Sequence, residues 1–225
     1  VSRGTRRGAV ETTLLRPLVR GETLSPWRLI PNDEHIVWTH GPDGSVLRRL
    51  PAGATRWLVA SRGRLERRVD SRSARWWALF RIECASCMTP RVVWADFGRR
   101  PRAAVLDAFD TTVPLNTCYS IACQTDPDAL ALAAILNSGV AAAWLGALAE
   151  PARGGYKRFL GWTVSRLPVP ADWMCARHIL ADIAREARDG RPPDPGALDL
   201  AVLDAYGLDH ITFAPLLEWS RSRNA

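Results

Sequence analysis

The sequence predicts an α+β fold, in which a mixed β-sheet region precedes a helical C-terminal subdomain. Two short runs, 91–95 and 117–122, are rich in the β-branched and aromatic residues that favour strands. Apolar side chains recur with the helical period in 51–69 and again after Asp172. With 225 residues, the chain is long enough to bury a core without disulfide bonds.

The first third of the chain predicts turns, one short strand and one basic helix. Prolines interrupt 14–38, a strand is expected at 35–39, and the Gly-Pro-Asp-Gly run at 41–44 predicts a turn. The helix expected at 51–69 has an apolar face made of Ala54, Trp57, Leu58, Ser61 and Leu65. The opposite face is expected to present Arg56, Arg62, Arg64, Arg67 and Arg68.

The middle of the chain predicts a broken helix and a glycine-rich loop. Asp126 is expected as the N-cap of a helix with Pro127 at its first position. This helix is expected to break at 137–139 before it resumes. Residues 153–156 predict a loop, and a short strand is expected near Thr163.

The C-terminal part predicts helices only. Asp172 is expected to cap a helix that ends at Gly190, and a proline-rich hinge follows at 191–196. Two shorter helices are expected at 197–206 and 210–220.

The charge of the chain favours nucleic acid as a partner. The net charge is +7, and Lys157 is the single lysine among 30 basic residues. Guanidinium groups bind phosphates and guanine edges in a bidentate manner. The arginines of 56–81 predict either a surface that follows phosphates or a merely solvated face. The ten tryptophans predict either stacking on bases or packing in the core. The glycine-rich loop predicts either close contact with a nucleic-acid backbone or a simple loop.

The sequence lacks the common catalytic motifs. It contains no G-x-G-x-x-G, no phosphate-binding P-loop and no H-E-x-x-H, and its four histidines lie in unrelated contexts. Cys84 and Cys87 have the spacing of zinc ligands, but Cys118 and Cys123 fall in a predicted strand. We therefore expect no stoichiometric metal. The odd number of cysteines predicts a reducing, cytoplasmic location, and the apolar stretch 129–149 predicts a core helix rather than a membrane span.

Nine segments, taken in order, resemble the C-terminal specificity domain of TaqI-type adenine-N6 DNA methyltransferases, including the enzymes that fuse methylation with restriction or act in phage defence. They are E-T-T-L-L-R-P-L-V-R-G at 11–21, P-W at 26–27, W-W-A-L-F-R at 76–81, P-R-V-V-W-A-D at 90–96, V-P-L-N-T-C-Y at 113–119, L-N-S at 136–138, G-G-Y-K-R-F at 154–159, L-P-V-P at 167–170, and L-D with A-Y-G-L between 198 and 208.

The resemblance implies a division of labour between this chain and an upstream methyltransferase domain. The family's catalytic N-P-P-Y signature and its cofactor-binding motif do not occur here, so the chain is expected to be no enzyme on its own. S-adenosylmethionine is expected in the catalytic domain, and double-stranded DNA is the implied partner of this chain. Residues 1–13 are then a flexible connector, 14–170 the DNA target-recognition domain, and 171–225 the helical subdomain.

The DNA-contacting residues are expected on one basic surface. It combines the arginine face of the 51–69 helix with Arg81 and the loop 153–158, and loops near Trp27 and at 98–102 are the alternative location. The full set of expected contact residues is Arg20, Trp27, Arg56, Arg62, Arg64, Arg67, Arg68, Arg81, Arg153, Lys157 and Arg158. Two other functions stay open, namely a protein-interaction module that uses the helices after Asp172 and a metal-dependent enzyme that uses Cys84 and Cys87.

Overall fold

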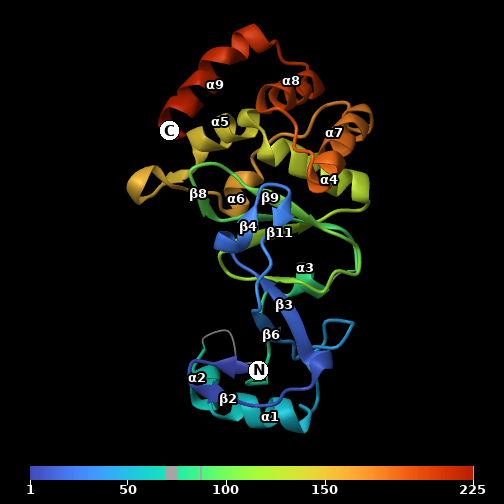
Figure 1. Cartoon of the computed structure of the whole chain (residues 1–225), viewed down its shortest axis with the longest axis vertical. Coiled ribbons are helices and arrows are strands. Elements are labelled where there is room, and N and C mark those ends of the chain that lie inside the picture. Colours follow the sequence, from blue (N-terminus) through green and yellow to red (C-terminus); the bar gives the residue numbers. More distant parts are fainter. Residues whose placement is uncertain (69–74, 87, 225) are drawn as a thin grey trace. The chain divides into compact units, whose positions relative to one another are not determined.

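The computed structural model describes residues 1–68, 75–86 and 88–224, and its helices and small mixed sheets confirm the α+β fold (Figure 1). The chain forms two compact units. Unit 1 consists of 1–18, 33–87 and 111–113, and unit 2 consists of 19–32, 88–110 and 114–225.

Unit 1 begins with a β-hairpin rather than with the expected flexible connector. Strands β1 (Ser2–Arg3) and β2 (Arg6–Arg7) pair antiparallel, with Gly4 in the left-handed region at the turn. After a 3-10 turn (Thr12–Leu14), strand β3 (Leu15–Val19) pairs antiparallel with β6 (His35–Val37), and β10 (Val113–Pro114) completes the sheet.

The expected basic helix is two helices, and this prediction was wrong. Helix α1 (Ala52–Val59) ends before α2 (Arg62–Glu66), and a short α3 (Glu83–Ser86) follows later. Arg6 of the N-terminal hairpin binds where α1 ends. Its Nη2 donates to the Arg56 and Trp57 carbonyls at 3.1 and 2.6 Å. A continuous helix needs those two carbonyls for the amides four residues later.

Unit 2 is built around an antiparallel sheet with β7 (Arg91–Ala95) at its centre. Strands β11 (Cys118–Ala122) and β9 (Ala103–Leu106) flank it, which confirms both strongly predicted strands. Two smaller sheets complete the unit. One contains β4 (Leu24–Ser25) and β5 (Arg28–Leu29), and the other has the order β12–β13–β8, with β12 at Glu150–Pro151, β13 at Lys157–Arg158 and β8 at Phe97–Gly98.

The broken helix was predicted correctly except for its cap. Helices α4 (Asp126–Asn137) and α5 (Gly139–Leu148) meet at a 70° bend, where the Ser138 side chain caps α5. The N-cap of α4 is Thr125 instead of Asp126, because its hydroxyl accepts from the Asp128 amide. No single helix in the described part of the chain is long and apolar enough to cross a membrane.

Residues near Thr163 form a helix instead of the expected strand. Helix α6 (Gly161–Val164) buries the Thr163 side chain completely, and its amides bond to carbonyls within the segment. Tertiary packing therefore outweighs the strand propensity of the β-branched residues in this stretch. The loop at 153–156 contains a 3-10 turn (Arg153–Gly155) with Gly154 at φ 73°.

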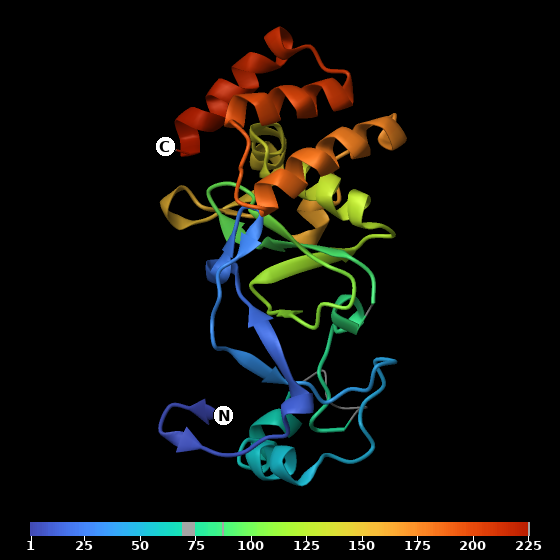
Figure 2. The same ribbon diagram turned by 45° about the vertical axis from the view of Figure 1, so that its right-hand side comes forward.

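Helices α7 (Trp173–Arg188), α8 (Pro195–Tyr206) and α9 (His210–Asn224) lie with α4 and α5 on one side of the sheet of unit 2 (Figures 1 and 2). They share one core with α4, in which Leu180 and Val202 are completely buried. The compact units therefore do not divide at residue 170, where the sequence placed a boundary.

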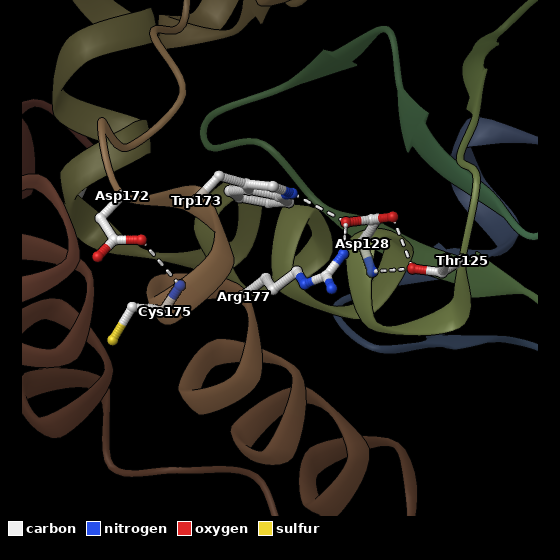
Figure 3. Close-up of polar contacts among 6 residues, drawn as sticks. All are labelled: Thr125, Asp128, Asp172, Trp173, Cys175 and Arg177. Carbon is white, nitrogen blue, oxygen red and sulfur yellow. Dashed lines mark hydrogen bonds and ion pairs between the residues drawn. The ribbon is translucent and has the colours of Figure 1, made fainter.

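A polar junction ties the start of α7 to the start of α4 (Figure 3). Asp128 Oδ1 accepts from Trp173 Nε1 at 2.8 Å and from Arg177 Nη1 at 3.2 Å, while Asp172 caps α7 through the Cys175 amide. Burial raises the pKa of Asp128, but hydrogen bonds from Thr125, Trp173 and Arg177 outweigh it, so the pKa is lowered.

Candidate nucleic-acid interface

The net positive charge of the chain lies in unit 1. Its residues include 14 arginines against seven acidic residues, which gives the whole net charge of +7. Unit 2 contains 16 basic and 16 acidic residues and is neutral as a whole. A polyanionic ligand is therefore attracted mainly to unit 1.

Helix α1 is fixed at both ends by charged residues of the N-terminal segment. The Glu11 carboxylate accepts from the amides of Gly53 and Ala54 at 2.8 and 2.9 Å, at the positive end of the helix. Hydrogen bonds from its own amide and from these two amides lower the pKa of Glu11. A Cβ on Gly53 would lie 2.9 Å from this carboxylate, so the cap requires glycine. Arg6 binds the opposite end and lies 4.3 Å from the ring centre of Trp57.

Three of the expected contact residues are exposed: Arg56 in α1, Arg64 in α2 and Arg67 at the C-cap of α2. Within the described part of the chain, their guanidinium groups have no hydrogen bond or ion pair inside the protein. Arg64 and Arg67 are three residues apart, and the C-cap Arg67 keeps helical backbone angles, so their side chains leave the chain on similar sides. These cations are therefore available to phosphate oxygens.

Two other arginines of this segment, Arg62 in α2 and Arg68 just after it, interact with the protein itself. Arg62 pairs with Glu66 at 2.7 Å and lies 5.6 Å from the Trp76 ring centre. Arg68 donates to the carbonyls of Leu65, Trp76 and Ala78 at 2.9 to 3.1 Å, and its guanidinium also lies over Phe80. Arg68 thus fastens the segment around residue 77 to α2.

The remaining expected contact residue of unit 1 is Arg81. It is exposed and has a φ of 54°, in the left-handed region that a non-glycine residue rarely adopts.

Unit 2 contains the other expected contact residues. Trp27 lies in the β4–β5 turn, where its amide bonds to the Ala103 carbonyl and its ring packs against the helical core. Arg20 precedes the 3-10 turn at 21–23, and its backbone amide bonds to the Thr23 hydroxyl. Trp27 therefore connects its turn to the body of the unit, whereas this Arg20 bond is local to the turn.

The basic loop at 153–158 is partly occupied by internal contacts. Lys157 Nζ donates to the Gly146 carbonyl at 2.7 Å, and Arg158 pairs with Asp96 at 2.7 Å, which raises the pKa of Arg158. Arg153 is exposed. The single basic surface predicted from the sequence combines residues of both units. Unit 1 contributes the exposed Arg56, Arg64 and Arg67, and unit 2 contributes the exposed Arg153.

Unit 2 contains an exposed aromatic pair that no pattern in the sequence indicates. The rings of Phe97 and Tyr156 stack with centres 4.8 Å apart and an interplanar angle of 14°. The guanidinium of Arg99 lies 6.0 Å from the Tyr156 ring centre. Only the pairing of β8 with β13 brings these residues together, since they are almost 60 positions apart in the sequence.

The cysteines form no metal cluster among the described residues, and Cys87 lies outside them. Cys118 is buried in β11, and burial raises the pKa of its thiol to about 12. A thiol that stays protonated is a poor metal ligand, because metals bind the thiolate. The placement of Cys118 fits the expectation of a small buried apolar residue.

Several segments that support the family resemblance contact each other in unit 2. Trp94 stacks on Tyr119 at 5.9 Å and donates to the Phe159 carbonyl at 2.8 Å. The side chain of Asn137 bonds to both the amide and the carbonyl of Ala103 at 2.9 Å, and thereby joins α4 to β9. These motif residues hold the fold together.

No protein-family model matches the chain, and a search of curated proteins found no match either.

Proposed function

We propose that this chain is the DNA-sequence-reading part of an adenine-N6 DNA methyltransferase of the restriction-modification or phage-defence kind. The ordered resemblance of nine segments supports the family, and the charge of unit 1 supports DNA as the ligand. The observation on which DNA binding rests is the exposed set Arg56, Arg64 and Arg67, whose guanidinium groups have no hydrogen bond or ion pair among the described residues.

In this proposal, holding the duplex and transferring the methyl group are tasks of different domains. A target adenine must leave the base stack before it is methylated, and the duplex must stay in register meanwhile. Arginines on phosphates fix that register, and a few side chains on base edges select the sequence. Methyl transfer belongs to the N-P-P-Y signature, which this sequence lacks, so calorimetric titration of the chain with S-adenosylmethionine should give no heat of binding.

The test is the salt dependence of duplex binding, measured by fluorescence anisotropy of a labelled duplex. If about five phosphates are neutralised, log affinity should fall against log salt with a slope near −4 to −5. The triple variant Arg56→Ala, Arg64→Ala, Arg67→Ala should flatten this slope by about one unit per lost contact.

A second triple variant serves as the matched control. Replacing Arg185, Arg188 and Arg191 of unit 2 with alanine removes the same charge from exposed positions, although Arg185 and Arg188 pair with Asp182 and Asp107. Its slope should stay that of the original protein. An unchanged slope in the unit 1 variant, or equal flattening in both, would contradict the proposed interface.

Sequence reading needs its own measurement. Selection from a pool of random duplexes should enrich one short site. Bound duplexes without a common sequence would contradict the reading role and leave a general duplex-binding module.

A docking module for a partner subunit is the second candidate. It is favoured by Met174 and Ile179, which are 59% and 58% exposed on α7. A chain that binds no duplex in the anisotropy titration but joins a subunit of its methyltransferase would support this function.

A further inference from the structure

Unit 2 contains a small basic projection that the expected interface does not explain. We call it the β8–β13 tip, and it consists of residues 96–102 and 150–159. The tip holds six basic residues against Asp96 and Glu150, although unit 2 as a whole is neutral. Positive charge is therefore concentrated at one place in a neutral body.

The tip presents two stacked aromatic rings to solvent. Phe97 and Tyr156 are 43% and 39% exposed, and their rings are nearly parallel at 4.8 Å. A third flat group can stack on the open face of such a parallel pair. The guanidinium of Arg99 lies 6.0 Å from the Tyr156 ring centre and adds positive charge beside the rings.

The backbone around the rings is held in place before any ligand arrives. Strand β8 pairs with β13, and the Ala152 amide bonds to the Tyr156 carbonyl at 2.7 Å. Lys157 and Arg158 are fastened to Gly146 and Asp96 as described above. Little conformational entropy is lost when such a preorganised surface binds.

We infer that the β8–β13 tip stacks on an unpaired nucleobase of DNA, with Phe97 and Tyr156 as the stacking surface and Arg100 and Arg153 near the adjacent phosphates. Both arginines are exposed. A nucleobase matches this surface because it is flat, aromatic and covalently joined to an anion. The inference deepens the proposed function and rests on DNA being the ligand, since a base that leaves the duplex leaves an unpaired partner behind.

The experiment uses the full chain and a duplex in which 2-aminopurine lies opposite an abasic site. The protein should quench the fluorescence of this unpaired base, and should bind the probe about tenfold more tightly than the fully paired duplex. Tyr156→Leu should abolish both the quenching and the preference. Tyr156→Phe, which keeps the ring, should retain them.

Two further variants separate stacking from folding and from charge. Phe109→Leu removes a 68% exposed ring outside the tip and should leave the quenching unchanged. Arg100→Ala should weaken binding of the probe without changing the quenching at saturation. No quenching by the original protein, or full quenching by folded Tyr156→Leu, would overturn the inference.

The two proposals fail in different ways. If Tyr156→Leu behaves as the original protein while the salt slope on paired duplex stands, the tip does not stack and the proposed function survives. If paired duplex does not bind but the single strand with 2-aminopurine is quenched through Tyr156, the tip binds bases and the duplex-reading function fails.

Discussion

The two compact units differ in what fills their interiors. Unit 2 buries large apolar clusters, in which Ile135, Leu136, Leu180 and Leu203 are at most 2% exposed. Among the described residues of unit 1, the main cluster is small and centres on Trp38, Ala85 and Val113. Around it, arginines lie over aromatic rings and donate to backbone carbonyls.

This difference changes how the charge of unit 1 should be interpreted. A unit with little apolar surface to bury gains stability from arginines that stack and donate hydrogen bonds. Arg6, Arg16 and Arg68 have such roles. The number of cations therefore overstates how many of them are available to phosphates, and single substitutions can separate the two classes.

The largest expected effect is in the core of unit 2. Leu180→Ala removes a completely buried side chain and should lower the free energy of unfolding by about 2–5 kcal/mol. Denaturant unfolding measures this loss. The adjacent Ile179→Ala, at a 58% exposed position, is the control and should cost less than about 0.5 kcal/mol. Equal losses at the two positions would mean that this cluster does not stabilise unit 2.

The next effect distinguishes neighbouring arginines of unit 1. Arg68→Ala removes hydrogen bonds to three carbonyls and should destabilise unit 1 by about 1.5–3 kcal/mol. Arg67→Ala should leave unfolding unchanged and lower the salt slope of duplex binding by about one unit. If Arg67→Ala proves as destabilising as Arg68→Ala, exposure does not separate binding from structural arginines.

A smaller effect is expected at the end of α1. Arg6→Ala leaves two helix carbonyls without their cation and should cost about 1 kcal/mol. Hydrogen exchange of the α1 amides should then accelerate. Arg7 is exposed on the same hairpin, so Arg7→Ala is the matched control and should leave the exchange rates unchanged.

The smallest effect is a pH dependence confined to unit 1. Burial, and then the charge of Arg16, lower the pKa of His40 below its ordinary 6.5. The unfolded chain then binds a proton as pH falls through 6.5 while the folded chain resists it, so stability declines below that pH. The pKa of Asp128 in unit 2 lies below 3.8, and the stability that this carboxylate contributes persists until pH falls under that value.

Denaturant unfolding between pH 7 and pH 5.5, followed by hydrogen exchange in each unit, checks this difference. His40→Gln should remove the dependence from unit 1. A stability of unit 1 that rises as the pH falls would contradict the assigned direction.

The amino-acid sequence by itself determined the features that depend on neighbouring residues. The bend between α4 and α5 follows from Ser138, whose hydroxyl accepts from an amide only three residues away. Asp172 caps α7 across the same short separation. The helical period placed Arg56 and Arg64 on an exposed face, as observed, but it placed Arg68 on the same face, where the structure half-buries it against three carbonyls.

Tertiary structure decided whatever depends on residues far apart. Arg6 ends α1 from about 50 positions away, and Glu11 caps its start across more than 40. The Phe97–Tyr156 stack exists only because β8 pairs with β13. Periodicity and capping patterns report on interactions within one or two helical turns, so they contain no information about which distant side chain reaches a given carbonyl or ring. The physical reason is that such contacts form only when the chain has folded back on itself.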